Sequence, residues 1–211
     1  MKLQKIGGVA SVANAVVSAI FLVILVVVFP RLGLIGPNDW MDPAKNISAW
    51  AASPVAFFSL DIEYILFGIA SLLTMLALRE RMQADAPILT QTALIVISIA
   101  CALWLAAGLV DHTMRLAIIS AGGDASAFRA AMAVFFGLSD GGDHASGWAL
   151  LLIGWAALKT AKLPRMLGYL IVLAGLILIF DFLSMVLSIV ALALWIILFL
   201  WLGIVLLRTE S

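Results

Sequence analysis

Residues 166–207 read MLGYLIVLAGLILIFDFLSMVLSIVALALWIILFLWLGIVLL, and this apolar run decides the fold class. As one helix it would extend roughly 63 Å at about 1.5 Å per residue, about twice the thickness of the hydrocarbon core of a bilayer. The run must therefore fold back on itself. Asp181 and Ser184 lie near its midpoint, so the sequence predicts two membrane-spanning helices joined by a turn at these residues.

The rest of the chain has the same apolar character. Hydrophobic residues make up 65% of the sequence and charged residues only 11%, and the mean hydropathy is +1.20. We expect a single all-α integral membrane domain over residues 1–211, with no soluble domain. Its six predicted spans are residues 7–29, 54–78, 88–110, 144–160, 164–183 and 186–207. The first apolar run is longer than the roughly 7–15 residues of a signal peptide, so we expect it to be retained.

The distribution of Lys and Arg predicts how these spans are oriented. One side carries Lys2, Lys5, Arg79, Arg81, Lys159, Lys162, Arg165 and Arg208, and the other carries only Arg31, Lys45, Arg115 and Arg129. Because the side richer in Lys and Arg is cytoplasmic, both termini are expected in the cytoplasm. Acidic and basic residues number 12 each, so the chain offers no basic surface for nucleic acid.

Two longer segments on the extracytoplasmic side are expected to form a cap. Residues 30–53 contain two turn signals, and Trp40 and Trp50 are suited to the membrane interface. Residues 111–143 are expected to be a long loop, in which residues 126–138 form a short amphipathic helix. The predicted fold is thus a six-helix bundle with a cap of loop and amphipathic helix over its outer end.

Ionisable side chains are costly in hydrocarbon, so those within or beside the spans are the functional candidates. The ligand-binding candidates are Asp61, Glu63, Tyr64, Asp111, His112, Arg115, His144 and Asp181. Their ionisable members other than Tyr64, together with Asp143, are expected in the outer third of the bilayer or at its rim. Each helical residue advances about 100°, so Asp61 and Glu63 should point to opposite flanks of Ile62, about 200° apart. Both flanks lie outside the large apolar stripe of that helix, and both are expected to face protein.

Several acidic and basic residues, inside and outside this list, have a purely structural interpretation. Asp143 follows two glycines and precedes a predicted span, which favours an N-cap, and Asp124 is expected to cap the amphipathic helix. Asp140 is interpreted as a solvated loop acid. Asp111 and Arg115 are four residues apart and can form a salt bridge along a helix. The two histidines are more typical of hydrogen-bonded interfacial groups than of metal ligands.

Three short segments carry a resemblance to a known family. They are residues 42–49 (DPAKNISA), residues 144–154 (HASGWALLLIG) and residues 163–176 (LPRMLGYLIVLAGL). Together they resemble a family of bacterial six-helix membrane proteins catalogued only as a domain of unknown function, whose fifth helix opens with a similar Pro-Arg-x-Leu-Gly signature. The resemblance implies an integral protein of the bacterial cytoplasmic membrane and assigns no catalytic residue.

The sequence leaves three functional hypotheses open. The leading one is not enzymatic: an outward-facing polar cavity binds or carries a cation or the headgroup of an amphiphile. The second is a membrane-embedded enzyme for a lipid-like substrate, with a divalent metal on His112, His144 and Asp61, or with Asp61 and Glu63 as acid and base. The third is an accessory or assembly subunit that forms a homo-oligomer or contacts a partner membrane subunit. The sequence contains no G-x-S-x-G or H-E-x-x-H motif, and it indicates no cofactor besides that metal.

Overall fold

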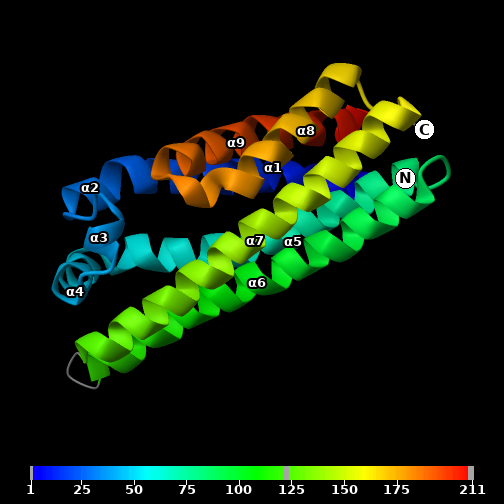
Figure 1. Cartoon of the computed structure of the whole chain (residues 1–211). Helices are drawn as coiled ribbons and strands as arrows, with labels where there is room; N and C mark the ends of the chain where they lie inside the picture. Colours follow the sequence, from blue (N-terminus) through cyan, green and yellow to red (C-terminus); the bar gives the residue numbers. More distant parts are fainter. Residues whose placement is uncertain (1, 121–123, 209–211) are drawn as a thin grey trace.

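The chain is helical throughout the residues described by the computed structural model, 2–120 and 124–208 (Figure 1). The helices are α1 (Lys2–Val23), which continues through the π-helical turn η1 (Ile24–Val28) into α2 (Phe29–Arg31), then α3 (Pro37–Trp40), α4 (Pro43–Ala52), α5 (Pro54–Met82), α6 (Pro87–Ser120), α7 (Ala125–Thr160), α8 (Arg165–Phe180), the 3₁₀ turn η2 (Asp181–Leu183) and α9 (Met185–Arg208). The predicted all-α class is confirmed.

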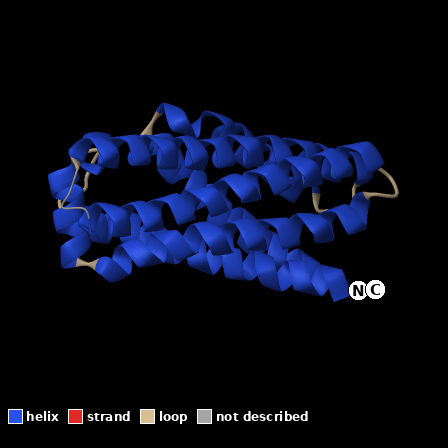
Figure 2. Ribbon diagram, turned by 90° about the horizontal axis from the view of Figure 1, so that it is seen from below, coloured by secondary structure: helices blue, strands red, loops and turns tan. Residues whose placement is uncertain are grey.

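In the described part of the chain, the six longest helices form a closed ring (Figures 1 and 2). α5 packs against α1 and α6, α7 packs against α6 and α8, and α9 packs against α8 and returns to α1. Short connections favour such antiparallel neighbours. The start of α1 and the end of α9 lie at one end of the bundle, which we call the terminal end, and α3 and α4 lie at the other, the cap end (Figure 1).

Among the described residues, five helices are long and apolar enough to cross a membrane: Leu3–Arg31, Pro54–Met82, Pro87–Ile118, Arg165–Leu183 and Met185–Arg208. The chain is therefore a helical membrane protein, with the lipid bilayer as its surroundings. The predicted turn is confirmed, because α8 ends at Phe180 and α9 begins at Met185. The predicted span 144–160 lies within α7, a less apolar helix that also contains Asp140, Asp143 and Lys159.

The prediction of a long loop over residues 111–143 is wrong. α6 continues to Ser120, and α7 begins at Ala125 behind Asp124, whose carboxylate accepts from two backbone N–H groups as an N-cap. The expected amphipathic helix is therefore the first part of α7, not a separate cap element. The Gly-Gly pair at residues 141–142 does not break α7, because the helix packs against α6 at this point. A Cβ atom at Gly142 would lie 2.6 Å from the Trp104 indole, so glycine is required for this contact.

The cap end is built by α3, α4 and an aromatic cluster beneath them. The ring of Trp40 packs edge-on against Phe29, with centroids 4.7 Å apart, and Phe29 contacts Phe57 of α5 at 5.2 Å. The Asp39 carboxylate accepts from the Lys45 ammonium and from two backbone N–H groups. These bonds lower the pKa of Asp39 to about 2, the Lys45 bond contributing most, and the same pair raises the pKa of Lys45. Helical turns thus fix the predicted 30–53 segment over the ring.

α7 and α8 approach so closely that glycine is needed on both. A Cβ atom on Gly147 would lie 2.8 Å from the carbonyl oxygen of Gly175, and the reciprocal distance is also 2.8 Å. We expect Gly147→Ala to destabilise the protein by about 1–3 kcal/mol, because both partners are backbone and the helices must separate. Gly137→Ala is the matched control on the same helix, where nothing lies within 4 Å. It should stabilise α7 by about 0.5–1 kcal/mol. Unfolding titrations of both variants in detergent would show opposite shifts; equal shifts would contradict the close packing.

Candidate functional site

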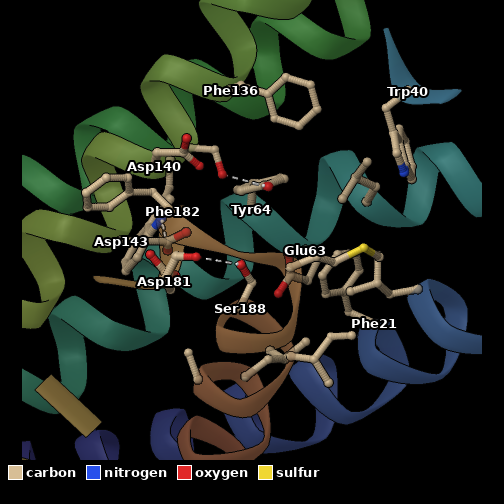
Figure 3. Close-up of a pocket in the computed structure, with 18 of the residues that line it drawn as sticks. Phe21, Trp40, Glu63, Tyr64, Phe136, Asp140, Asp143, Asp181, Phe182 and Ser188 are labelled. Atoms are coloured by element: carbon tan, nitrogen blue, oxygen red, sulfur yellow. Dashed lines mark hydrogen bonds between the residues drawn. The ribbon is translucent and has the colours of Figure 1, made fainter. Parts of the chain in front are cut away.

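A cavity of about 450 Å³ lies inside the ring, in the half of the bundle nearer the cap end, where Phe29, Pro37 and Trp40 line it; Figure 3 shows part of its lining. We call it the central cavity. Its polar lining consists of Glu63, Tyr64, Ser139, Asp140, Asp143, Asp181, Ser184 and Ser188. Its apolar lining includes Phe21, Leu25, Phe29, Leu60, Phe67, Leu178, Ile189, Leu192 and Trp195. The lining therefore combines carboxyl and hydroxyl groups with aliphatic and aromatic side chains.

Glu63 is the most distinctive residue of the central cavity. Its side chain projects from α5 into the space enclosed by the ring (Figure 3), and the residue is only 5% exposed. Across the described residues, no hydrogen bond or ion pair is formed by its carboxylate. A buried carboxylate without a partner carries a large desolvation cost, so its presence points to a ligand that supplies the missing charge or donors.

Three further carboxylates reach the cavity from other elements. Asp140 and Asp143 come from α7, and Asp181 comes from the turn between α8 and α9 (Figure 3). Asp143 accepts a hydrogen bond from the Trp104 indole N–H at 3.0 Å, and Asp181, Asp140 and Glu63 are its acidic neighbours. Among the described residues that line the cavity, none is Lys, Arg or His. The lining therefore contains four carboxyl groups and no basic side chain that could neutralise them.

The cavity is closed toward the terminal end by a floor of aromatic rings. Phe67 packs edge-on against Trp104 at 4.5 Å and stacks on Trp195 at 4.6 Å, and Trp195 stacks on Phe199 at 4.3 Å. The Trp195 indole N–H also donates to Asn14 of α1 at 3.3 Å. Exposed lining residues such as Asp140 and Met185 lie on the other side of this floor, so the cavity is accessible from the half nearer the cap end.

A second group of polar residues lies on the opposite flank of α5, against α6 and α4. The Arg115 guanidinium donates to both carboxylate oxygens of Asp111, at 3.0 and 2.7 Å, and to the side-chain oxygen of Asn46. It also lies 4.3 Å from the centroid of the Phe57 ring. The predicted Asp111–Arg115 salt bridge is thus confirmed, and it is buried.

Asp61 belongs to this second group and faces a separate cavity. Its Oδ2 lies 3.0 Å from Nδ1 of His112. A lateral cavity of about 320 Å³ reaches this pair from the side of the bundle and is lined by Trp50, Pro54, Val55, Phe58, Asp61, His112, Arg115 and Leu116. Asp61 and Glu63 therefore point to opposite sides of α5, as their helical positions predict.

His144 lies in neither cavity. Its Nδ1 donates to the carbonyl oxygen of Ile179 at 3.1 Å, and its Nε2 accepts from the indole N–H of Trp148 at 3.2 Å. Both ring nitrogens are engaged, and the side chain is exposed on α7. Within residues 2–120 and 124–208, no group of three or more His, Cys, Asp or Glu side chains is arranged to hold a metal ion.

The structure thus divides the sequence candidates into three places. Glu63, Tyr64 and Asp181 line the central cavity, and the Tyr64 hydroxyl contacts Ser139 at 2.9 Å. The lateral group contains Asp61, Asp111, His112 and Arg115, and His144 stands alone at the α7–α8 contact.

Sequence reasoning missed the contribution of α7 to the central cavity. The prediction of an N-cap at Asp143 is wrong, since this residue lies in the interior of α7. Asp140 is not a loop acid but a helical residue at the cavity. A usable signal was present in the buried face of α7, whose members recur at alternating four- and three-residue spacing: Phe128, Met132, Phe135, Ser139, Gly142 and Ser146.

Comparison of the chain with protein-family models, with curated proteins and with solved structures found no match. The functional argument therefore depends on the geometry of the two cavities.

Proposed function

We propose that the protein is a six-span membrane protein with both termini in the cytoplasm, and that its central cavity binds or carries an organic cation. The sixth span is the part of α7 over residues 144–160, and it is supported by the position of α7 between α6 and α8, which are both long and apolar enough to cross. The excess of Lys and Arg at the terminal end supports the orientation, and the resemblance to the bacterial six-helix family supports the bacterial cytoplasmic membrane. The central cavity then opens on the outer side.

The observation that carries the proposal is the buried, unpartnered carboxylate of Glu63 within a lining whose other charged groups are also acids. Burying like charges together is unfavourable, and the charges are neutralised either by protons or by a bound cation. A ligand with at least one positive charge removes this cost and satisfies Glu63. An anionic ligand would increase the repulsion.

The apolar part of the lining indicates which class of cation fits the cavity. Aliphatic and aromatic side chains make up much of the lining, and Trp40, Tyr64 and Phe67 contribute aromatic rings, which can attract cations. A volume of about 450 Å³ is within the range of sites for small organic molecules. A lipophilic amine or quaternary cation fits this combination of acidic and apolar lining residues better than a bare metal ion. Among the described residues, no group of three or more His, Cys, Asp or Glu side chains is arranged to hold a metal ion.

The two alternative functions are a membrane-embedded enzyme and an accessory subunit, and the structure favours neither. Asp61 and Glu63 line separate cavities, so they are not placed to act as acid and base on one substrate. An accessory subunit without a ligand would not need an acidic cavity inside its own ring. The non-enzymatic binder or carrier is the function that the geometry supports best.

Binding of two matched probes tests the proposal. Tetraphenylphosphonium and tetraphenylborate have nearly the same size and apolar surface but opposite charge. We expect saturable binding of the phosphonium, measured by quenching of the Trp fluorescence of the cavity. Its affinity should exceed that of the borate at least about tenfold, or about 1.4 kcal/mol, because ionised carboxylates attract the cation and repel the anion. Equal affinities, or binding of neither probe, would overturn the assignment.

A further inference from the structure

The lateral group on α5 and α6 contains a buried atom that its neighbours leave unsatisfied. Oδ1 of Asp61 is buried and has no hydrogen-bond partner within the described part of the chain. The carboxyl group of Asp111, which is 0% exposed, is a neighbour of the Asp61 carboxyl group. When both groups are ionised, two acceptors oppose each other and no donor lies between them.

The neighbours of Asp111 do not remove this conflict. Each of its oxygens already accepts from Arg115, which leaves one lone-pair direction on each for a further donor. Asn46 and Trp50 of α4 add no ionisable group to the lateral site. The cluster thus contains two carboxylates, one permanent cation and one histidine, all supplied by α5 and α6.

From this geometry we infer that Asp61 and Asp111 hold one proton between them, and that His112 exchanges it with the outer side of the membrane. A proton on Oδ1 of Asp61 donates to Asp111, satisfies the unpartnered atom and leaves one net negative charge opposite Arg115. Two carboxylates that share a site share one proton for the same reason in other proteins.

His112 is placed to deliver that proton. Its Nδ1 lies 3.0 Å from Oδ2 of Asp61 and its side chain is 44% exposed, against 8% for Asp61. A proton that bonds to Nε2 from the outer side releases the Nδ1 proton to Oδ2 of Asp61, and rotation of the carboxyl group then turns it toward Asp111. In the reverse step Asp61 returns its proton to Nδ1 while the Nε2 proton leaves to the outer side, which restores the first tautomer of the ring.

Infrared spectra of the reconstituted full chain test the shared proton directly. We expect the wild type to show a protonated-carboxyl stretching band that is lost in Asp61→Asn and persists in Glu63→Gln, where a different buried carboxyl is removed. His112→Gln should retain this band, but in deuterated buffer the shift of the band caused by exchange of the proton for deuterium should be slower than in the wild type. A spectrum of Asp61→Asn that keeps every protonated-carboxyl band of the wild type would overturn the inference.

Thermal unfolding provides a second readout that does not depend on assigning the band. If the folded state holds a proton that the unfolded chain has already released, the free energy of unfolding falls as the pH rises, until the folded state releases the proton too. In Asp61→Asn the amide N–H replaces that proton as the donor to Asp111 at every pH. The Tm of the variant should therefore rise relative to the Tm of the wild type as the pH increases. Parallel Tm curves would contradict the shared proton. Failure of cation binding in the central cavity would leave this result unaffected.

Discussion

Glu63→Gln is expected to weaken the binding of tetraphenylphosphonium by about tenfold to a hundredfold, the equivalent of about 1.4–2.8 kcal/mol, because the attraction between the carboxylate and the cation is lost. The amide keeps the size of the side chain and removes its ability to carry a negative charge. Because Glu63 has no partner in the described structure, no ion pair is broken by the change. The affinity for tetraphenylborate should instead increase, since the cavity becomes less negative.

The same substitution should make the protein more stable. A lone buried carboxylate pays a desolvation cost that a neutral amide largely avoids. A fall in affinity together with a rise in Tm is the signature of a group retained for binding; a structural acid would lose stability. Glu80→Gln is the matched control, because it makes the same change on the same helix at an exposed position. It should alter neither affinity nor Tm.

Arg115→Met is expected to destabilise the protein by about 3–5 kcal/mol, the cost of leaving one member of a buried ion pair unpaired. Arg115 is 5% exposed and Asp111 0%. The substitution removes both hydrogen bonds to Asp111, the bond to Asn46 and the contact with the Phe57 ring.

Denaturant titrations of single and double variants measure this effect. Adding Asp111→Leu to Arg115→Met should recover most of the lost stability, since an apolar pair of similar volume often replaces a buried ion pair at little cost. Arg129→Met, at an exposed position of α7, serves as the control and should change stability by less than about 0.5 kcal/mol. A loss of that small size for Arg115→Met would mean that the ion pair is open to water.

Much of the fold could be predicted because hydrocarbon length and polarity leave few choices. The turn at Asp181 and Ser184 follows from the length of the surrounding apolar run, and the opposite directions of Asp61 and Glu63 follow from the helical period. The Asp111–Arg115 pair follows from four-residue spacing. Each of these features is local in sequence or is imposed by the bilayer.

The features that sequence reasoning missed depend on tertiary contacts. The continuity of α7 through Gly142 depends on a tryptophan of α6 that lies against it. Once α7 continues, Asp140 and Asp143 turn inward and join Glu63, although they are separated from it by a large part of the chain. The separation of Asp61 from Glu63 into two cavities was visible in the helical period, but the partners of each carboxylate were not.

The aromatic floor formed by Phe67, Trp104, Trp195 and Phe199 has an electrical consequence. It ends the water-accessible path within the bundle, so in the proposed orientation the membrane voltage falls partly across the central cavity and partly across the rings below. A cation that reaches Glu63 has then crossed a fraction of that voltage, and crossing all of it is worth about 2.3 kcal/mol per 100 mV. An inside-negative potential therefore draws the ligand in, and occupancy in an energised membrane exceeds that measured in detergent.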